Sequence, residues 1–403
     1  MVVTIASFLF TYIAFSIGRV PGLRSDRVAA AIIGGVILIA AGVLSVPEAQ
    51  AAVDGSTLAL LFGMMVLSAA LDLSGAFAVV GWWVSRHARG PLGLMVAIAL
   101  ASAVLSAFLI NDVVCIAFTP LVLHIASSVR RDPKPYLLAL ATSSNIGSVA
   151  TVTGNPQNIL IASLSHVSYG HFAAVLGPIA GAALVGNVAV VWLVHHRDMG
   201  GAFIVSPDGE KPTLHRRLAW KSGLVMAGVL AAFAAGVPPV VASLLGAAVM
   251  MLTRATDPKR LYVRVDWTLL ALFAGLFVVV AGVEKSGLAQ TLLRILRPLH
   301  PDSVVGLTAI TAVLSNLVSN VAAVMMLKSL VPRLPDPQSA WFTLAMASTL
   351  AGNLTLPGSL ATVIVAERAK GSASISFLDF LKVGTPSALI SLAIGATWLA
   401  FVR

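Results

Sequence analysis

Two polar clusters interrupt an apolar stretch of the sequence between residues 105 and 163. The first is Asn111-Asp112, and the second runs from Asn145 to Asn158. A membrane tolerates non-helical backbone only where protein or a water-filled cavity receives the freed N–H and C=O groups. Amide and hydroxyl oxygens can ligate a cation, whereas helix N-termini offer N–H groups to an anion. The pattern therefore predicts a solute site near the middle of a bilayer.

A weaker copy of this stretch lies at residues 314–367. Ser315 and Asn320 follow Ser106 and Asn111 at one shared offset of 209, since 315 − 106 = 320 − 111. Matched landmarks in the same order in both halves indicate an internal repeat. Glycines of the second cluster match as well once a one-residue gap is allowed, namely Gly147 and Gly154 with Gly352 and Gly358.

Composition predicts an all-α polytopic membrane protein. Of 403 residues, 58% are hydrophobic and only 10% are charged, against about 25% charged in a typical soluble domain. The net charge of +10 lies in short loops, where it orients the spans, so no nucleic-acid partner is expected. A single cysteine excludes a disulfide framework within the chain. No Walker A pattern, paired catalytic carboxylates or metal-ligand spacing indicates an enzyme.

The polar clusters must be positioned by membrane-spanning elements. Regions 91–129 and 301–329 are apolar with a polar break, so each is one long span or a re-entrant hairpin, and charge distribution favours hairpins. Segments 74–90 and 286–300 are interpreted as amphipathic arms at the interface. The remaining apolar segments lie at about 1–18, 28–46, 56–73, 135–165, 170–194, 218–236, 237–253, 267–283, 338–366 and 383–400.

These elements predict two inverted repeats of five spans, residues 1–194 and 218–403, joined by a cytoplasmic linker at 195–217. Each repeat has an interfacial arm, a re-entrant hairpin and a broken helix. The hairpins are 91–129 and 301–329, and the broken helices are 135–165 and 338–366. Most of the 26 lysines and arginines then face the cytoplasm, with both termini outside a cell (inner) membrane.

Asp112 is the one acid at a break inside an apolar region. A carboxylate at that depth requires a cation, a proton or a fixed dipole as its partner. Asp112 is therefore either part of a Na⁺ or H⁺ coupling site or a cap for the helix that follows it, and both roles can coexist. The matched position in the second half is Val321, so the role is not duplicated.

The two broken segments carry further neutral ligands. A simple kink satisfied by neighbouring helices is the alternative, but a kink does not need so many polar side chains. The residues expected to bind solute or ion are Asn111, Asp112, Asn145, Thr151, Thr153, Gly154, Asn155, Asn158, Ser319, Asn320, Asn353, Thr355, Gly358, Ser359 and Thr362.

Four stretches carry a family resemblance: LSAFLINDVVCIAFTPLVL, SSNIGSVATVTGNPQNILIAS, LVSNVAAVMML and LAGNLTLPGSLATVIVAE. They resemble the ion-transporter superfamily of arsenite permeases, NhaD-type sodium/proton antiporters, citrate transporters and divalent-anion/sodium symporters. The resemblance implies solute between the hairpin tips and the unwound segments, in a domain that moves against a scaffold. The Asn-Asp-Val tip at 111–113 looks more like the arsenite-permease and antiporter branch. Symporters of dicarboxylates usually show Ser-Asn-Thr at both tips, whereas this chain has Ser-Asn-Val at the second only.

The expected function is secondary active transport of a small inorganic anion or oxyanion, such as arsenite or antimonite, coupled to H⁺ or Na⁺ by alternating access. A bound Na⁺ near Asn111, Asp112, Asn145 and Asn320 is the only cofactor considered. The alternatives are a Na⁺/H⁺ antiporter, a di/tricarboxylate or sulfate symporter, a channel, and a membrane subunit of an ATPase-driven pump. The expected partners are the lipid bilayer, the anion and its coupling cation, with a homodimer or an ATPase subunit suggested by family analogy alone.

Overall fold

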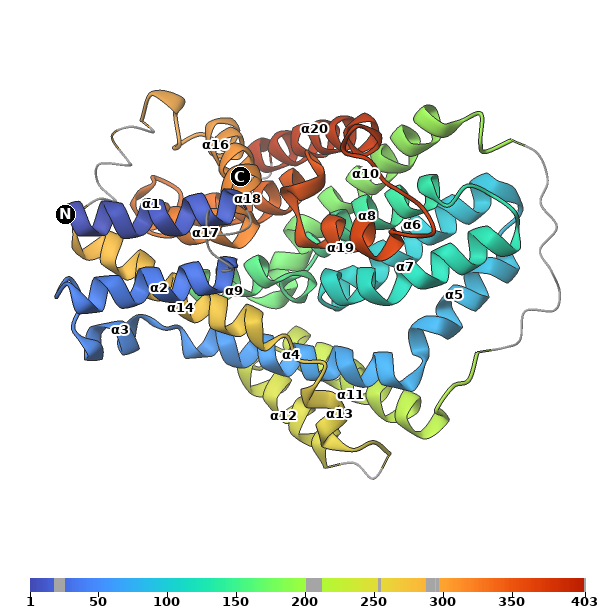
Figure 1. The fold of residues 1–403 in the computed structure, drawn as a ribbon, viewed down its shortest axis with the longest axis horizontal. Coiled ribbons are helices and arrows are strands. Elements are labelled where there is room, and N and C mark those ends of the chain that lie inside the picture. The colour runs from blue at the N-terminus through green and yellow to red at the C-terminus, as the bar shows by residue number, and fades with distance from the viewer. Residues whose placement is uncertain (18–25, 201–211, 253–254, 288–293, 295–296, 402–403) are drawn as a thin grey trace.

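The computed structural model describes residues 1–17, 26–200, 212–252, 255–287, 294 and 297–401. The described residues form helices and connecting turns, with α1, α2 and α4 running along the long axis of the molecule (Figure 1). The helices of the first half are α1 (Val2–Ile17), α2 (Arg27–Ala40), α3 (Val46–Ala52), α4 (Gly55–Ser74), α5 (Ala76–His87), α6 (Gly90–Phe108), α7 (Asn111–Ser128), α8 (Lys134–Ser148), α9 (Pro156–Ser165) and α10 (Tyr169–His195).

The second half repeats much of this order. Its helices are α11 (Arg216–Ala234), α12 (Pro239–Met251), α13 (Pro258–Tyr262), α14 (Trp267–Lys285), α16 (Val304–Val318), α17 (Asn320–Leu327), α18 (Pro337–Leu350), α19 (Leu360–Ala369) and α20 (Phe377–Phe401). The pair α6–α7 corresponds to α16–α17, and α8–α9 corresponds to α18–α19. The predicted arm at 286–300 lies mostly outside the described residues. The inverted orientation of the halves in a membrane stays a prediction.

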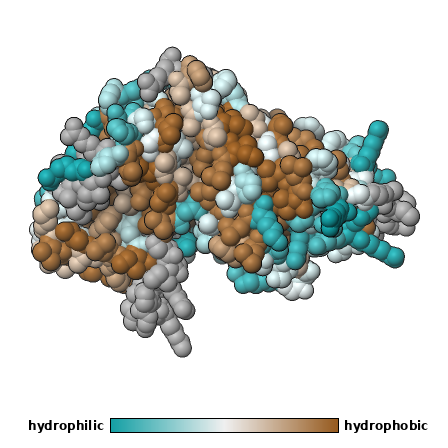
Figure 2. All heavy atoms as spheres, turned by 90° about the horizontal axis from the view of Figure 1, so that it is seen from above, coloured by the Kyte–Doolittle hydropathy of each residue, from teal (hydrophilic) through white to brown (hydrophobic). Residues whose placement is uncertain are grey.

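The expectation of a polytopic all-α membrane protein is confirmed. Seven of the described helices are long and apolar enough to cross a bilayer, and four more apolar helices are shorter. Large apolar side chains remain exposed on them, including Val104 of α6, Val185 of α10 and Val313 of α16. Figure 2 shows apolar side chains gathered over the middle of one face, with hydrophilic ones concentrated towards one end. Such a surface is suited to lipid rather than to water.

Both expected breaks occur as two helices rather than one. Only Leu109 and Ile110 separate α6 from α7, and Ser319 alone separates α16 from α17. The first arm is the amphipathic helix α5, which buries Phe77, Gly81 and Val84. Phe77 packs edge-on against Phe118 of α7, with ring centroids 6.2 Å apart. The arm therefore packs against the first hairpin.

Helices of the two halves pack closely together. In one group of helices, α2 packs on α14, and α4 packs on α11 and α12. In the other group, α10 packs on α20, and α7 and α8 pack on α19. A hydrogen bond of 2.6 Å from Ser387 to the buried Asn187 side chain joins α20 to α10. Each group therefore contains helices from both halves of the chain.

Ion pairs link distant segments within the described part of the chain. Lys285 pairs with Glu48 at 2.6 Å, and Lys328 lies 3.9 Å from Glu284. At span ends predicted to face the cytoplasm, Lys134 pairs with Asp379 and Arg264 pairs with Asp72. Each pair joins ends that the charge distribution assigns to one side of the membrane. Which side faces the cytoplasm stays a prediction.

Candidate functional site

A cavity of about 250 Å³ lies where the N-termini of six helices meet. Four of these helices begin at the breaks, namely α7, α9, α17 and α19, and the other two are α2 and α14. The first turn of a helix has backbone N–H groups without an intrahelical partner and the positive end of the helix dipole, roughly half an elementary charge. Side-chain caps satisfy part of these groups in α2, α9, α14 and α17. The cavity is therefore a place where backbone alone can attract an anion.

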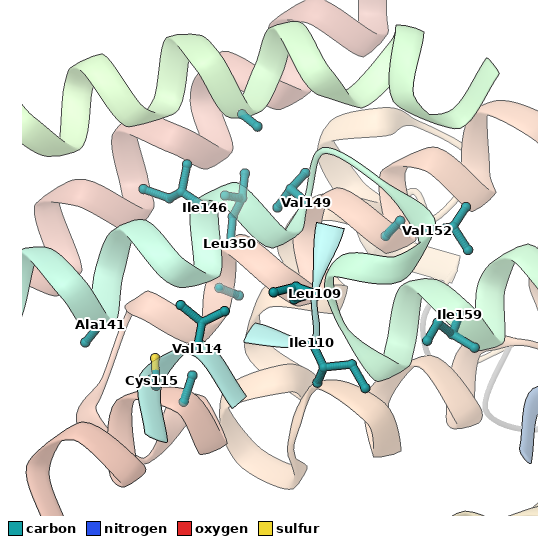
Figure 3. Packing of buried hydrophobic residues seen from close by; sticks show 14 of the residues in the cluster. Leu109, Ile110, Val114, Cys115, Ala141, Ile146, Val149, Val152, Ile159 and Leu350 are labelled. Carbon is teal, nitrogen blue, oxygen red and sulfur yellow. The ribbon is translucent and has the colours of Figure 1, made fainter. Parts of the chain in front are cut away.

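Apolar packing fixes the first hairpin tip. Leu109 and Ile110 are buried in extended backbone between α6 and α7. Figure 3 shows them among apolar side chains of neighbouring elements, including Ile146 of α8 and Ile159 of α9. The next residue, Asn111, is 4% exposed and donates from Nδ2 to Asn145 Oδ1 at 3.0 Å. The tip is thus held by apolar contacts on one side and by an amide on the other.

The second tip turns within one residue. Ser319 has φ +98°, a conformation that side-chain-bearing residues rarely adopt. Its hydroxyl caps α17 by accepting from Ala322 N. We assign Asn320 the amide orientation in which Nδ2 donates to Ser348 O at 3.0 Å and to Gly358 O at 3.1 Å. The tip of the second hairpin is thereby tied to α18 and to the break that follows it.

The two broken helices meet at the centre of the molecule. Asn145 donates from Nδ2 to Asn353 Oδ1 at 2.8 Å, and its own Oδ1 accepts from Ser359 Oγ at 3.0 Å. Asn353 in turn donates to the backbone oxygen of Thr142 at 3.0 Å. Asn145 and Asn353 are fully buried. They form a polar link between the halves directly behind the cavity wall.

The expected site residues fall into three groups. Asn145 and Asn353 form the link just described. The residues that line the cavity are Asn111, Asp112, Ser319, Asn320, Gly358 and Ser359. The residues outside its lining are Thr151, Thr153, Gly154, Asn155, Asn158, Thr355 and Thr362.

Several residues outside the cavity lining form hydrogen bonds with backbone groups that the breaks leave without a partner in a helix. Asn158 donates to the backbone oxygens of Ser148 and Thr151 at 3.0 and 2.9 Å. Thr362 donates to the oxygen of Leu356 at 2.7 Å. Gly154 lies so close to Ser148 that a Cβ there would overlap its backbone. These residues shape the broken segments in this conformation, which is the requirement that a break inside a membrane imposes.

Sequence reasoning missed charged residues on the cavity wall. Asp26 and Arg27 at the start of α2, and Asp266 before α14, line the same cavity as Asp112. Asp26 and Asp266 are N-caps, each accepting a backbone N–H through Oδ1 at 2.9 Å. In the sequence they look like ordinary loop acids. The one sequence feature that could have drawn attention to Asp266 is its place in the internal repeat.

Asp266 follows Asp54 at an offset of 212, the same offset that separates Gly75 from Gly287. Asp54 also caps a span, α4, but its Oδ2 accepts from Ser163 Oγ at 2.8 Å rather than facing the cavity. No group of three or more His, Cys, Asp or Glu side chains within the described ranges is arranged to hold a metal ion.

Comparison with known proteins identifies the chain's relatives. The family model described as "Citrate transporter", CitMHS, matches residues 12–351. The chain is 30% identical to the silicon efflux transporter LSI3 of Oryza sativa subsp. japonica, over 93% of each chain. It is 25% identical to a Dictyostelium discoideum protein named as the transporter arsB, over 93% of this chain and 87% of the relative.

A solved structure extends the likeness to the fold. The YdaH transporter of Alcanivorax borkumensis superposes with a TM-score of 0.60 at 15% identity, covering 98% of this chain and 97% of that one. At that identity the likeness concerns architecture alone. The family match and the apolar helices show a multi-pass membrane transporter. This protein therefore belongs to the citrate transporter (CitMHS) family of the ion transporter superfamily.

Proposed function

We propose that this protein is a secondary active transporter of a small inorganic oxyanion, coupled to H⁺ or Na⁺. The observation that carries the proposal is the convergence of the N-termini of α7, α9, α17 and α19 on one cavity. Such N-termini stabilise negative charge without a fixed cation. The cavity, at about 250 Å³, is smaller than the roughly 300–1,000 Å³ typical of drug-sized ligands. A compact oxyanion suits that volume.

The names of the relatives support the same class of solute. One is a silicon efflux transporter, and another is named as the transporter arsB. Silicon dissolves as a compact hydroxylated oxyacid, which has the size and chemistry of the oxyanions expected from the sequence. The family name, citrate transporter, makes a carboxylate the competing solute. Neutral amides and hydroxyls at Asn111, Asn320 and Ser359 suit either a neutral oxyacid or its anion.

The cavity, the hairpins and the broken helices fit an alternating-access mechanism of transport. The cavity is lined by Asp26 and Asp266, which follow segments predicted to be cytoplasmic, so we infer a conformation open towards the cytoplasm. The hairpins and broken helices would carry the solute against α2, α4, α12 and α14. We place the protein in the inner membrane, with both termini outside and the linker at 195–217 in the cytoplasm.

A second candidate is Na⁺/H⁺ antiport without an anion. Three carboxylates, those of Asp26, Asp112 and Asp266, line the cavity beside one guanidinium, that of Arg27. An excess of carboxylates favours a cation or a proton in the same space. In the oxyanion mechanism, Asp112 instead holds the coupling ion next to the solute.

Uptake into proteoliposomes distinguishes the two. Arsenite, silicate, phosphate, sulfate, citrate and Na⁺ are offered separately under an imposed pH or Na⁺ gradient, without an ATPase. We expect an oxyanion to accumulate, and Asp112→Asn to lose gradient-driven accumulation by about tenfold or more while retaining solute exchange. Asp257→Asn, an exposed N-cap of α13 away from the cavity, is the matched control. Na⁺ exchange for H⁺ with no movement of any anion would establish the antiporter instead.

A further inference from the structure

Three buried hydroxyls without a protein partner lie on one pair of helices. They are Oγ1 of Thr308 and of Thr311 on α16, and Oγ of Ser339 on α18. Among the residues that the structure describes, only three other buried side-chain atoms lack a partner. Thr311 is fully buried and Thr308 is 7% exposed. Burying a hydroxyl without a hydrogen-bond partner destabilises the folded protein, so a cluster of three requires a physical explanation.

The helices α16 and α18 pack against each other. Spacings of three and four residues place Thr308, Thr311 and Ser315 on one face of α16, and Ser315 of that face hydrogen-bonds to α18. At one end a small cavity is lined by Ser303 and Leu307 together with Ser339 and Thr343. At the other end, Ser315 donates to Ser348 O at 3.0 Å. Thr308 and Thr311 lie between these two levels on α16. The volume of the small cavity, about 10 Å³, is close to that needed for one water molecule.

The contact connects one end of the molecule to the candidate site. Asp302 and Asp336 line its mouth, which the charge distribution places outside. At its inner end, Ser315 Oγ lies 2.9 Å from the amide of Asn320, which lines the central cavity. From Thr308 to Ser315 the helix rises roughly 10 Å at 1.5 Å per residue. Polar groups therefore continue from the mouth to the wall that Asn320 shares with Asp112.

The matched positions on α6, in the first half, carry no unpaired hydroxyl. At the shared offset of 209, Ala99 and Ser102 of α6 correspond to Thr308 and Thr311. Ala99 has no hydroxyl, and Ser102 is satisfied by donating to Ala99 O at 3.1 Å. The repeated fold therefore does not by itself require unpaired hydroxyls at this helix contact. They are a property of α16 and α18.

We propose that the α16–α18 contact holds a single file of water that carries protons between the Asp302–Asp336 mouth and the central site. Buried water makes two to four hydrogen bonds, so water between these helices would satisfy the hydroxyls. A path of one-water width admits a relayed proton and excludes an oxyanion or a hydrated Na⁺. The inference rests on the proposed transport function and names H⁺ as its coupling ion. The carboxylate of Asp112 is the acceptor at the inner end.

Thiol accessibility tests the water file without reference to transport. In a Cys115→Ala background, Thr308→Cys and Thr311→Cys are each treated with hydrogen peroxide, an oxidant close to water in size, and the loss of free thiol is followed with time. Ser102→Cys is the matched control at the equivalent repeat position. We expect Thr311→Cys to react at least about tenfold faster than Ser102→Cys. Equal, slow reaction of all three would overturn the proposal, because it would mean that the helix contact is dry.

Transport by Thr311→Val tests the proton role. Valine keeps the shape of threonine but removes the hydroxyl. We expect pH-driven accumulation to fall several-fold while exchange of solute at equal pH is unchanged, with Thr311→Ser restoring accumulation. Equal loss of both activities would show a purely structural role and overturn the proposal. If wild type moves no oxyanion at all, the proposed function fails, yet fast oxidation of Thr311→Cys by peroxide would still establish the water file.

Discussion

Asn145 and Asn353 share a hydrogen bond of 2.8 Å although 208 positions separate them in the chain. Each stands in the broken helix of its own half, and each is fully buried. Asn145 also contacts the first hairpin tip through Asn111 and the second broken helix through Ser359. One amide thus joins three of the elements whose ends form the cavity. If the hairpins and broken helices move during transport, this link makes them move as one body.

Replacing Asn353 with alanine should therefore lower the stability of the folded protein around the Asn145–Asn353 link. The change leaves Asn145 Nδ2 without its acceptor in a buried site, which costs about 1–3 kcal/mol. We expect a lower thermal midpoint and reduced uptake. Cys115 is the sole cysteine and is fully buried, so its reaction with a thiol dye reports unfolding. Gln50→Ala, on an exposed position of α3, is the control, and an unchanged midpoint for Asn353→Ala would contradict the structural role of the link.

Gly147 is a position where the close approach of two helices excludes a side chain. A Cβ at Gly147 would overlap the backbone of Ala103 on α6. We expect Gly147→Ala to destabilise the protein by about 1–3 kcal/mol, the usual cost of overpacking, and more if the backbone cannot shift. A Cβ added at Gly177 on α10 would meet no neighbouring atom within 4 Å, so Gly177→Ala is the matched control. Equal thermal midpoints for the two variants would show that α6 and α8 are not in such close contact.

Asp266 should influence the affinity for a charged solute. Asparagine caps a helix as well as aspartate does, so Asp266→Asn removes a charge while keeping α14 capped. A negative charge removed from the cavity wall should strengthen binding of an anion by up to about tenfold. A neutral oxyacid would bind unchanged.

The measurement is the substrate concentration for half-maximal exchange. Asp54→Asn, at the matched cap outside the cavity lining, serves as control. Weaker binding of an anion by Asp266→Asn would contradict the electrostatic role assigned to the cavity wall.

Glu48 provides a test of stability against pH. Hydrogen bonding from Lys285, at 2.6 and 2.7 Å, and then from the Ser45 backbone lowers the pKa of Glu48 from 4.5 to about 2. A lowered carboxyl pKa stabilises the folded protein above the unfolded pKa, and the stabilisation disappears as pH falls through the folded value. The advantage of wild type over Glu48→Gln should therefore be constant above pH 5 and vanish between about pH 4.5 and 2.

Thermal midpoints over this pH range measure the effect. The same comparison in a Lys285→Met background is the control, because the lysine that lowers the pKa is then absent. A difference between wild type and Glu48→Gln that is the same at pH 2 and pH 7 would contradict the assignment.

The outline of the architecture follows from local features of the amino-acid sequence. Hydropathy and charge predict the spans, and clustered Gly, Pro, Asn and Ser predict the breaks at Asn111, Asn320 and in both broken helices. These features are local, because a helix must end where its backbone is interrupted, whatever packs around it. The shared offset of 209 further predicted that the tips belong to corresponding elements. The family resemblance, which the comparisons confirm, follows from the same motifs.

Which polar groups face the cavity depends on how distant segments pack together. Asn158 and Ser359 are both polar residues of a broken helix, yet Asn158 satisfies released backbone and Ser359 lines the cavity. Asp26 and Asp266 look like loop acids, and they reach the cavity because α2 packs against α14 near the hairpin tips. Convergence of six N-termini depends on contacts between segments hundreds of positions apart. A local sequence pattern does not show which distant segments converge. It also does not show whether a polar side chain binds backbone or solute, because the same residue types do both.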